Sequence, residues 1–317
     1  MIATNTTKLF VHNGGLVWRM MLYLVVCVLI IGGLSIAVCY PFIAELMSAG
    51  VFNEIFLLLT NNIANVQMGQ MFSALADITV HIFEIIASNL GLILPMAILL
   101  FVIVCVLGGF LVGLAELAVA DYMYGYMSSN TKYGFMNCFV KNIVKSIKLQ
   151  LLKCAVLLPF RLVVCGVIIG GLLLFTTGNF WLILLAPFMI ILVLCLLFAL
   201  KNAFFSAWIP CVVVRDLPPL EALRLSISDV TKNFGKIYGR YFVVAILMVA
   251  VSFAAVTLTA SVGLLLVVPA YMLFAIIINM VIYFYINGLK FYVDSDEIIT
   301  SKKKEDWENI NSLKYII

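Results

Sequence analysis

Six long apolar runs dominate this sequence and limit the folds that are open to it. A helix needs about 20 predominantly apolar residues to cross the roughly 30 Å hydrocarbon core of a bilayer. The runs that reach this length are residues 17–40, 91–116, 158–177, 180–208, 241–261 and 263–288. We therefore predict an all-α polytopic membrane helix bundle with six transmembrane helices, forming one membrane domain over residues 1–288.

The composition fits a lipid environment better than water. Hydrophobic residues make up 65% of the chain and charged residues 11%, against about 45–50% and about 25% in typical globular chains. Too few polar side chains remain to cover a soluble body, which excludes a soluble enzyme, a nucleic-acid binder and a disordered scaffold. No phosphate loop, GxSxG or HExxH pattern is present, and the eight cysteines lack metal-binding spacing. We expect no catalytic residue, no metal site and no cofactor.

The basic residues predict the orientation in the membrane. All 19 Lys and Arg lie in four groups. These groups are found before or at the start of the first run, between the second and third runs, around the end of the fourth run and before the fifth, and after the sixth. If the runs cross the membrane in turn, all four groups lie on the same side. Cytoplasmic segments carry the excess of Lys and Arg in membrane proteins. We therefore expect a multi-pass plasma-membrane protein with both termini in the cytoplasm. An outer helical loop at residues 43–90 and a cytoplasmic tail at residues 289–317 follow from this topology.

Two segments on the predicted cytoplasmic side have the periodicity of amphipathic helices. In residues 131–156 the apolar side chains recur three and four apart, and Lys141, Lys145 and Lys148 fall on the opposite side. Residues 216–235 repeat this pattern, with Asp216 expected as the N-cap. Each helix is expected to lie in the inner interface with its apolar face toward the lipid.

These two helices also suggest an internal repeat. Each follows an outward-to-inward span and precedes an inward-to-outward span. Spans two and three with their helix, and spans four and five with theirs, therefore look like two copies of one unit in the same orientation. Such a parallel repeat would be related by an axis along the membrane normal.

The second segment carries a resemblance to a known family. Residues 209–226 read IPCVVVRDLPPLEALRLS and residues 231–236 read TKNFGK. This resembles a six-span bacterial and archaeal membrane family that includes the membrane domain attached to some glycerophosphodiester phosphodiesterases. The family pattern is a span ending in Pro, an acidic turn and an Ala-Leu-x-x-Ser helix that ends near Asn-Phe-Gly. The matching residues here are Ala222, Leu223, Ser226, Asn233, Phe234 and Gly235. Ile227 stands where that family often has Trp. The resemblance implies a six-span membrane fold and supplies no catalytic residue, because the sequence contains no phosphodiesterase domain.

Glu116 and Lys201 are charges near the inner ends of spans, at loosely matching positions of the two copies. A charge at mid-bilayer costs about 2.5–3.5 kcal/mol on insertion scales. One interpretation is an intramembrane ion pair that lines or closes an inward-facing cavity. The other is that each side chain reaches the interface on its own.

Two further polar groups each have two interpretations. Asp77, His81 and Glu84 fall at i, i+4 and i+7, which suits either three metal ligands or the wet face of an interfacial helix. We favour the wet face. The lysines in residues 131–156 either bind anionic lipid head groups, each contributing about 1 kcal/mol, or reflect the orientation rule alone.

These observations favour a non-enzymatic integral membrane protein that organises lipid or serves as the membrane subunit of a larger assembly. The expected partners are membrane lipids, anionic ones in particular, and a protein on the cytoplasmic side; nucleic acid is not expected. The alternative is a transporter or permease subunit with an inward-facing polar site at Glu116 and Lys201.

Overall fold

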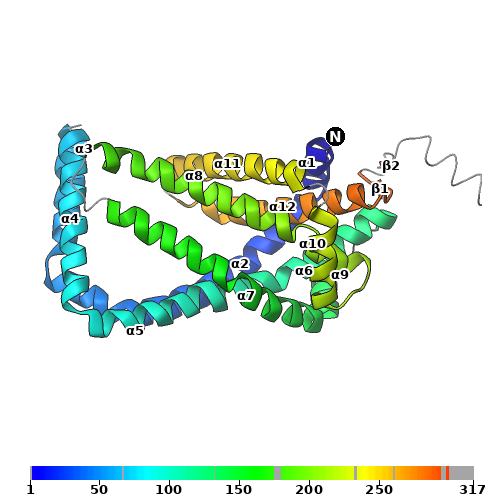
Figure 1. Cartoon of the computed structure of the whole chain (residues 1–317), viewed down its shortest axis with the longest axis horizontal. Helices are drawn as coiled ribbons and strands as arrows, with labels where there is room; N and C mark the ends of the chain where they lie inside the picture. Colours follow the sequence, from blue (N-terminus) through cyan, green and yellow to red (C-terminus); the bar gives the residue numbers. More distant parts are fainter. Residues whose placement is uncertain are drawn as a thin grey trace, which may run out of the picture. The chain divides into compact units, whose positions relative to one another are not determined.

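The computed structural model describes residues 2–65, 68–131, 133–174, 180–231, 234–259, 261–293 and 298–299, and nearly all of these are helical (Figure 1). Six helical stretches within these ranges are long and apolar enough to cross a membrane. They are Gly15–Ser48, Leu90–Ser129, Phe135–Leu173, Leu184–Val214, Phe234–Thr259 and Leu264–Ile286. The prediction of an all-α, multi-pass membrane protein is therefore confirmed.

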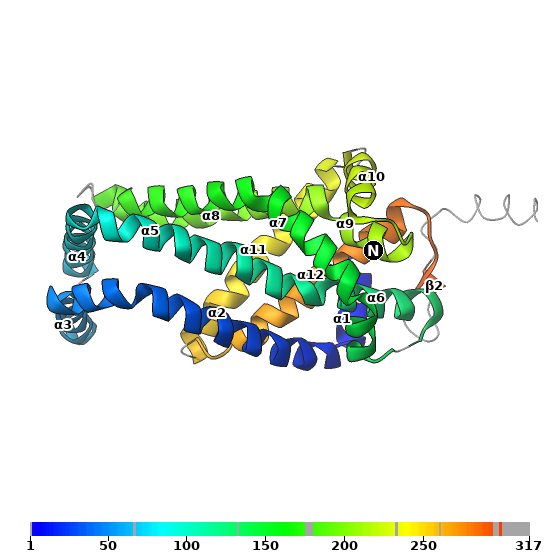
Figure 2. The same cartoon turned by 90° about the horizontal axis from the view of Figure 1, so that it is seen from below.

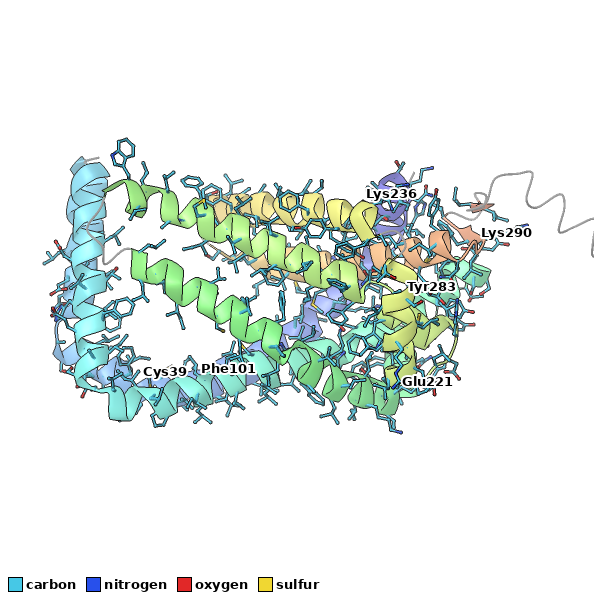
Figure 3. All side chains as sticks on the ribbon, viewed as in Figure 1. Cys39, Phe101, Glu221, Lys236, Tyr283 and Lys290 are labelled. Carbon is cyan, nitrogen blue, oxygen red and sulfur yellow. The ribbon has the colours of Figure 1, made fainter. Side chains whose placement is uncertain are left out.

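The long helices leave most of their apolar side chains uncovered (Figure 3). In α11 (Phe234–Thr259) none of the residues in the most apolar window is buried, and Phe253 and Leu258 are 71% and 83% exposed. A large apolar side chain loses about 1.5–3 kcal/mol when it remains in water instead of being buried. This surface is therefore suited to hydrocarbon.

The chain divides into two compact units. One contains Met1–Cys27, Phe110–Ala155 and Phe198–Ile317, and the other contains Val28–Gly109 and Val156–Leu197. The division falls between Gly109 and Phe110, at the start of α6 (Gly109–Ser129), and inside three further long helices, so each of these contributes to both units. They are α2 (Gly15–Ser48), α7 (Phe135–Leu173) and α8 (Phe180–Phe205).

In the first unit, a short helix that the sequence analysis did not anticipate packs against α12 (Leu264–Ile286). This helix is α1 (Ile2–His12). Its buried stripe includes Asn5 and Thr6 as well as Ile2 and Leu9, which hides the apolar periodicity on which sequence analysis depends. The Thr6 hydroxyl donates to the carbonyl of Ile2 at 2.9 Å, so the helix backbone satisfies this buried polar group.

The C-terminal part of the first unit is a chain of helices around Trp208. Its elements are α9 (Trp208–Val214), α10 (Pro219–Thr231), α11 and α12. Trp208 Nε1 donates to the carbonyl of Pro219 at 2.8 Å and fixes the turn between α9 and α10. Only a few small residues join the last two apolar runs, which predicts a hairpin of these two spans, and α11 lies beside α12 (Figure 2).

The expected tail begins with a small antiparallel pair, β1 (Phe291–Tyr292) and β2 (Ile298–Ile299). Phe291 is 1% exposed, and its ring lies 5.8 Å from that of Phe284. The start of the tail therefore belongs to the folded unit. Residues 294–297 and 300–317 lie outside the described ranges.

The second unit contains α3 (Val51–Asn65), α4 (Met68–Ser88), α5 (Leu90–Phe101) and the π-helix η1 (Val102–Gly108). Helices α3 and α4 lie side by side (Figure 1), around a core of Val51, Ile78 and Ile85. They occupy most of residues 43–90, which were expected to form an outer helical loop.

Helix α7 differs from the sequence analysis, which separated an amphipathic helix at 131–156 from a span at 158–177. The structure has one continuous helix of 39 residues. The residues around the expected break include no glycine, and Pro159 lies inside the helix, where a proline removes one hydrogen bond and kinks a helix without having to end it. At 1.5 Å per residue this helix is about 60 Å long, roughly twice the hydrocarbon thickness.

Candidate functional site

A row of polar side chains joins α7 to α6 (Gly109–Ser129). The bonds are Gln150 Nε2 to Gly113 O (2.7 Å), Ser146 Oγ to Leu114 O (2.8 Å) and Asn142 Nδ2 to Asp121 Oδ2 (2.8 Å). Residue numbers rise along one helix as they fall along the other, so the helices are antiparallel. The three donor residues on α7 are almost fully buried. Because uncovered polar groups are expensive in hydrocarbon, such buried contacts suit a membrane helix pair.

The N-terminal half of α7 has three faces rather than the two that periodicity predicted. The first face is an apolar stripe that includes Met136, Val140 and Val144, each of which is more than 60% exposed. At about 100° per residue, the polar row lies roughly opposite this stripe. Lys141, Lys145 and Lys148 therefore lie on one flank between the two faces. This order puts charge at the edge of an uncovered apolar surface.

Glu116 contacts Lys153, not Lys201. Its Oε2 atom forms an ion pair with Lys153 Nζ and accepts from Gln150 Nε2 at 3.2 Å. The side chains of Glu116 and Lys153 are 24% and 13% exposed. The Lys201 ammonium lies 5.4 Å from the centroid of the Phe198 ring. The pairing suggested by the two matching positions is therefore corrected, because α7 supplies a closer cation.

Two glycines of the second span make room for polar side chains. A Cβ atom at Gly113 would collide with the Gln150 side chain, and one at Gly109 would collide with the guanidinium of Arg161. Arg161 Nη1 donates to the carbonyl of Cys105, which lies in the π-helix η1. Glycines permit close packing in membrane helices, and here the groups that approach them are side chains that bind backbone oxygen. Gly166 and Gly170 of the third apolar run have the GxxxG spacing that permits close helix packing, but a Cβ atom at either position would have no neighbour within 4 Å.

The flanking lysines are partly paired with carboxylates. Lys141 Nζ lies 3.1 Å from Asp121 Oδ2, and Lys145 Nζ pairs with Asp216. Lys148 is exposed, and its ammonium has no hydrogen bond or ion pair to any residue that the structure describes. Helix α10 begins at Pro219, three residues after Asp216, so Asp216 is not its N-cap. The Lys145 ammonium instead holds the pKa of the Asp216 carboxyl below its usual value.

The family-like motif lies where α10 meets its neighbours. Ala222 and Ser226 are fully buried, in a helix that packs on α9. Ser226 Oγ lies 3.5 Å from the carbonyl oxygen of Phe204. Leu223 is half-buried and Gly235 exposed, and the Phe234 ring lies 4.8 Å from that of Phe204. Asn233 lies outside the described ranges. On the outer side of α10, Leu220 and Ile227 are exposed, as is Glu221 (Figure 3).

A second polar contact set lies among α8, α11 and α12. The Tyr241 hydroxyl donates to Asn279 Oδ1, and Asn202 Nδ2 lies 3.4 Å from the Tyr271 hydroxyl. Tyr241 is almost fully buried. In the first unit, polar side chains thus join α6 to α7 and also join α8, α11 and α12 to one another.

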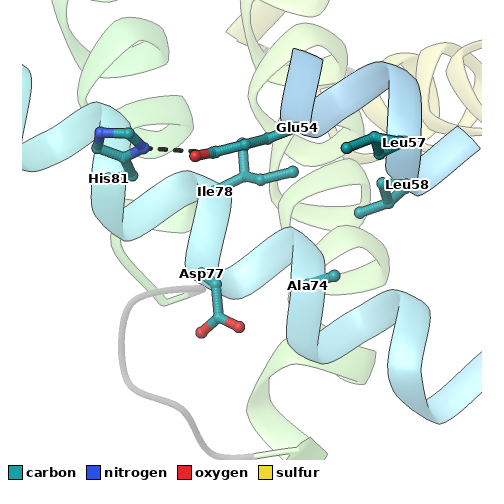
Figure 4. Close-up of a pocket in the computed structure, with 7 residues that line it drawn as sticks. All are labelled: Glu54, Leu57, Leu58, Ala74, Asp77, Ile78 and His81. Carbon is teal, nitrogen blue, oxygen red and sulfur yellow. Dashed lines mark hydrogen bonds and ion pairs between the residues drawn. The ribbon is translucent and has the colours of Figure 1, made fainter. Parts of the chain in front are cut away.

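In the second unit, Asp77 and His81 line a pocket of about 410 Å³ together with Glu54 of α3 (Figure 4). His81 Nδ1 lies 3.2 Å from Glu54 Oε2. Glu84, the third residue of the predicted set, is exposed and does not line this pocket. Within the part of the chain that the structure describes, no group of three or more His, Cys, Asp or Glu residues could hold a metal ion.

The partners that hold these sites together were not predicted from the sequence. Lys153 and Gln150 bind Glu116, and Glu54 binds His81. For the α7 residues a signal was present, since Asn142, Ser146 and Gln150 recur every four residues within an otherwise apolar and basic helix. Glu54 gave no comparable signal, because its contact with His81 depends on how α3 packs against α4.

Comparison of the chain with protein-family models, with curated proteins and with solved structures finds no match.

Proposed function

We propose that this protein is a non-enzymatic integral membrane protein whose helices α7 and α10 contact inner-leaflet lipid and bind anionic head groups. The single observation that carries the proposal is the order of faces on α7. An exposed apolar stripe, a flank of lysines and a buried polar row follow one another around the helix. Such a helix suits the interface, with its apolar face in acyl chains and its lysines at head-group level.

Two of the three lysines are already paired, and this shapes what they can bind. Exposed ion pairs contribute about 0–1 kcal/mol, so an anionic phosphate can share or displace either partner. Each lysine near an anionic leaflet contributes about 1 kcal/mol. Lys148 completes the flank as a cation without a carboxylate partner among the residues that the structure describes.

The test is lipid retention by the whole protein extracted in polymer nanodiscs. Lys141, Lys145 and Lys148 are changed to Gln together, and the matched control changes Lys8, Lys236 and Arg240 to Gln, which removes the same charge outside α7 and α10. We expect phosphatidylglycerol enrichment to fall several-fold in the first variant and to persist in the control. An equal loss of phosphatidylglycerol enrichment in both variants would show that the three lysines act only through the overall positive charge, and it would contradict the proposed binding. A stoichiometric protein partner in the same extract would favour a membrane subunit of a larger assembly.

The proposal includes cytoplasmic termini and a parallel repeat. The repeat is supported by two matching contacts, in which Ser146 binds the carbonyl of Leu114 and Ser226 that of Phe204. In each case a serine of an amphipathic helix reaches back to the span before it. Enzyme fusions that are active only in the cytoplasm or only outside it, placed at residue 317 and between α3 and α4, test the orientation.

A transporter or permease subunit remains the second candidate, carried by the ion pair of Glu116 and Lys153. Ionisable groups held between membrane helices commonly mark ion or substrate pathways. A Glu116→Gln variant that folds normally and keeps its cellular function would remove this candidate, whereas it leaves the lysine flank intact.

A further inference from the structure

A cavity of about 300 Å³ lies between the end of α6 and the start of α7, apart from the Glu116 site. Asp121, Tyr124 and Ser128 of α6 line it, together with Tyr133, Asn137 and Lys141. All belong to the first unit. Its size is at the lower end of ligand pockets, which are about 300–1,000 Å³. It therefore suits a small polar group rather than a large ligand.

The two charges of this cavity have opposite sign and different exposure. The Asp121 side chain is 16% exposed and that of Lys141 is 70% exposed. Asn142 donates to Asp121 Oδ2 at 2.8 Å and so fixes the carboxylate. Lys141 Nζ forms its ion pair with Oδ2 at 3.1 Å and lies 3.4 Å from the other oxygen, Oδ1, and this second distance is long for a charge-assisted bond. Oδ1 therefore keeps the capacity to accept a hydrogen bond from a ligand.

This arrangement complements a ligand that carries one ammonium and one phosphate. The ammonium would bind Asp121 beside the rings of Tyr124 and Tyr133, since aromatic faces attract cations. The phosphate would bind the more exposed Lys141. Inside the cavity, a ligand that is only anionic would lie close to Asp121 and one that is only cationic would lie close to Lys141, so the cavity favours a ligand that carries both charges. Lys145 and Lys148 do not line the cavity and keep their role toward anionic head groups.

The surface next to the cavity is apolar. Met136 and Val140, the neighbours of Asn137 and Lys141 in sequence, are 68% and 69% exposed. Acyl chains attached to a head group in the cavity would have an uncovered apolar stripe to lie against. We propose that this cavity binds the phosphoethanolamine head group of phosphatidylethanolamine; this inference rests on the proposed function, because it requires α7 to contact lipid.

The test measures lipid retained by the whole protein in nanodiscs that contain phosphatidylethanolamine, phosphatidylcholine and phosphatidylglycerol, using native mass spectrometry. We expect wild-type protein to retain phosphatidylethanolamine in preference to phosphatidylcholine, because a trimethylated ammonium cannot donate hydrogen bonds to Asp121. The Asp121→Asn variant should lose about tenfold or more of this preference, the amount expected for a hydrogen bond to a charged group. Glu221→Gln, which removes an exposed carboxylate from α10, is the matched control and should change nothing.

A second variant covers the case in which Asp121→Asn fails to fold. Asn137 is exposed, so Asn137→Trp fills the cavity without disturbing the ion pair, and it should abolish the preference. Equal retention of phosphatidylethanolamine and phosphatidylcholine by wild type, or a preference that survives Asn137→Trp, would overturn the inference. Both results are compatible with phosphatidylglycerol retention that still depends on Lys145 and Lys148, so the proposed function is judged separately.

Free phosphoethanolamine, added to the same sample, distinguishes the two sources of this head group. If it leaves the bound lipid in place at millimolar concentration, the lipid is the ligand. If it displaces the lipid and binds alone with the same dependence on Asp121, a soluble ligand replaces the lipid and the lipid assignment is overturned.

Discussion

The Lys153 ammonium on α7 forms an ion pair with the Glu116 carboxylate on α6, and Gln150 donates to the same oxygen of Glu116. Each of these helices belongs to a stretch that is long and apolar enough to cross a membrane. The two helices cover most of both side chains. Water therefore solvates only part of either charge if the ion pair is broken.

Removing one member of this pair should destabilise the protein more than removing both. Glu116→Gln leaves Lys153 largely buried without its counter-ion, which we expect to cost about 1–3 kcal/mol. The double variant Glu116→Gln with Lys153→Met replaces both charges by side chains of similar length and should recover part of that loss. Equilibrium unfolding in mixed detergent micelles measures the free energies. Additive single effects would mean that the two residues do not interact.

Gly113→Ala should destabilise the protein, while Gly166→Ala should not. A Cβ atom at Gly113 collides with Gln150 and would break its bond to the Gly113 carbonyl, with an expected loss of about 1–3 kcal/mol. At Gly166 the new methyl group meets nothing within 4 Å, and alanine favours the helix by up to about 1 kcal/mol. The midpoints of thermal unfolding of the two variants give the comparison. Equal loss in both would contradict a specific role for Gly113.

Much of the fold could be predicted because the apolar runs are long and each produces its own signal. The six spans and the last hairpin need no knowledge of the remaining chain. The continuity of α7 could not be predicted from its polarity, because residues 131–156 and 158–177 differ in composition although the helix hydrogen bonds run through both. Helix α1 was not predicted because polar Asn5 and Thr6 lie on its buried face and interrupt the apolar periodicity.

The candidate sites were predicted only in part, because sequence identifies charges and not their partners. The sequence identifies Glu116 as a charge within an apolar run, but the predicted repeat pointed to Lys201 as its partner, whereas Glu116 pairs with Lys153. Which lysine comes close depends on the antiparallel register of α6 and α7. His81 likewise acquires Glu54 from a separate helix, and spacing along α4 alone could not reveal that contact.

The Lys145–Asp216 pair should make stability depend on pH in the acid range. The lowered pKa of Asp216 in the folded state means that its contribution is fully present above the ordinary aspartate pKa. The contribution is lost as pH falls through the lowered value. Asp216→Asn should therefore unfold at a slightly lower temperature than wild type at neutral pH, and the difference should vanish in strong acid.

Asn is the appropriate substitute at this position because Asp216 has a positive φ of 55°, which Asn tolerates well. Lys145→Gln should behave like Asp216→Asn, and added salt should reduce both effects. A difference between wild type and Asp216→Asn that stays constant down to strong acid would show that the ion pair is not its cause.

Met136 and Tyr133 should differ in their reaction with hydroxyl radicals, although both are exposed on the protein surface, 68% and 54%. If the apolar stripe of α7 lies against hydrocarbon, Met136 is shielded by lipid, whereas Tyr133 lies in the polar turn before α7. Oxidation in nanodiscs that lack phosphatidylethanolamine, the lipid that would cover Tyr133 in the cavity, should therefore modify Tyr133 and spare Met136, once corrected for intrinsic reactivity and read by mass spectrometry. The fully buried Met123 serves as the protected reference. Rapid oxidation of Met136 would place the stripe in water.

Ser146 and Ser226 test the parallel repeat, because the two copies should use them in the same way. Each is buried and bonds the carbonyl of the preceding span, Ser146 at 2.8 Å and Ser226 at 3.5 Å. Alanine at either position removes one hydrogen bond, worth about 0.5–1.5 kcal/mol, and the shorter bond should give the larger loss.

Ser228→Ala, at an exposed position of α10, is the control and should have no effect. Unfolding free energies in detergent that rank Ser146→Ala above Ser226→Ala, and both above Ser228→Ala, would support equivalent contacts in the two copies. A loss at Ser146 alone would limit the contact to the first copy and remove this support for the repeat.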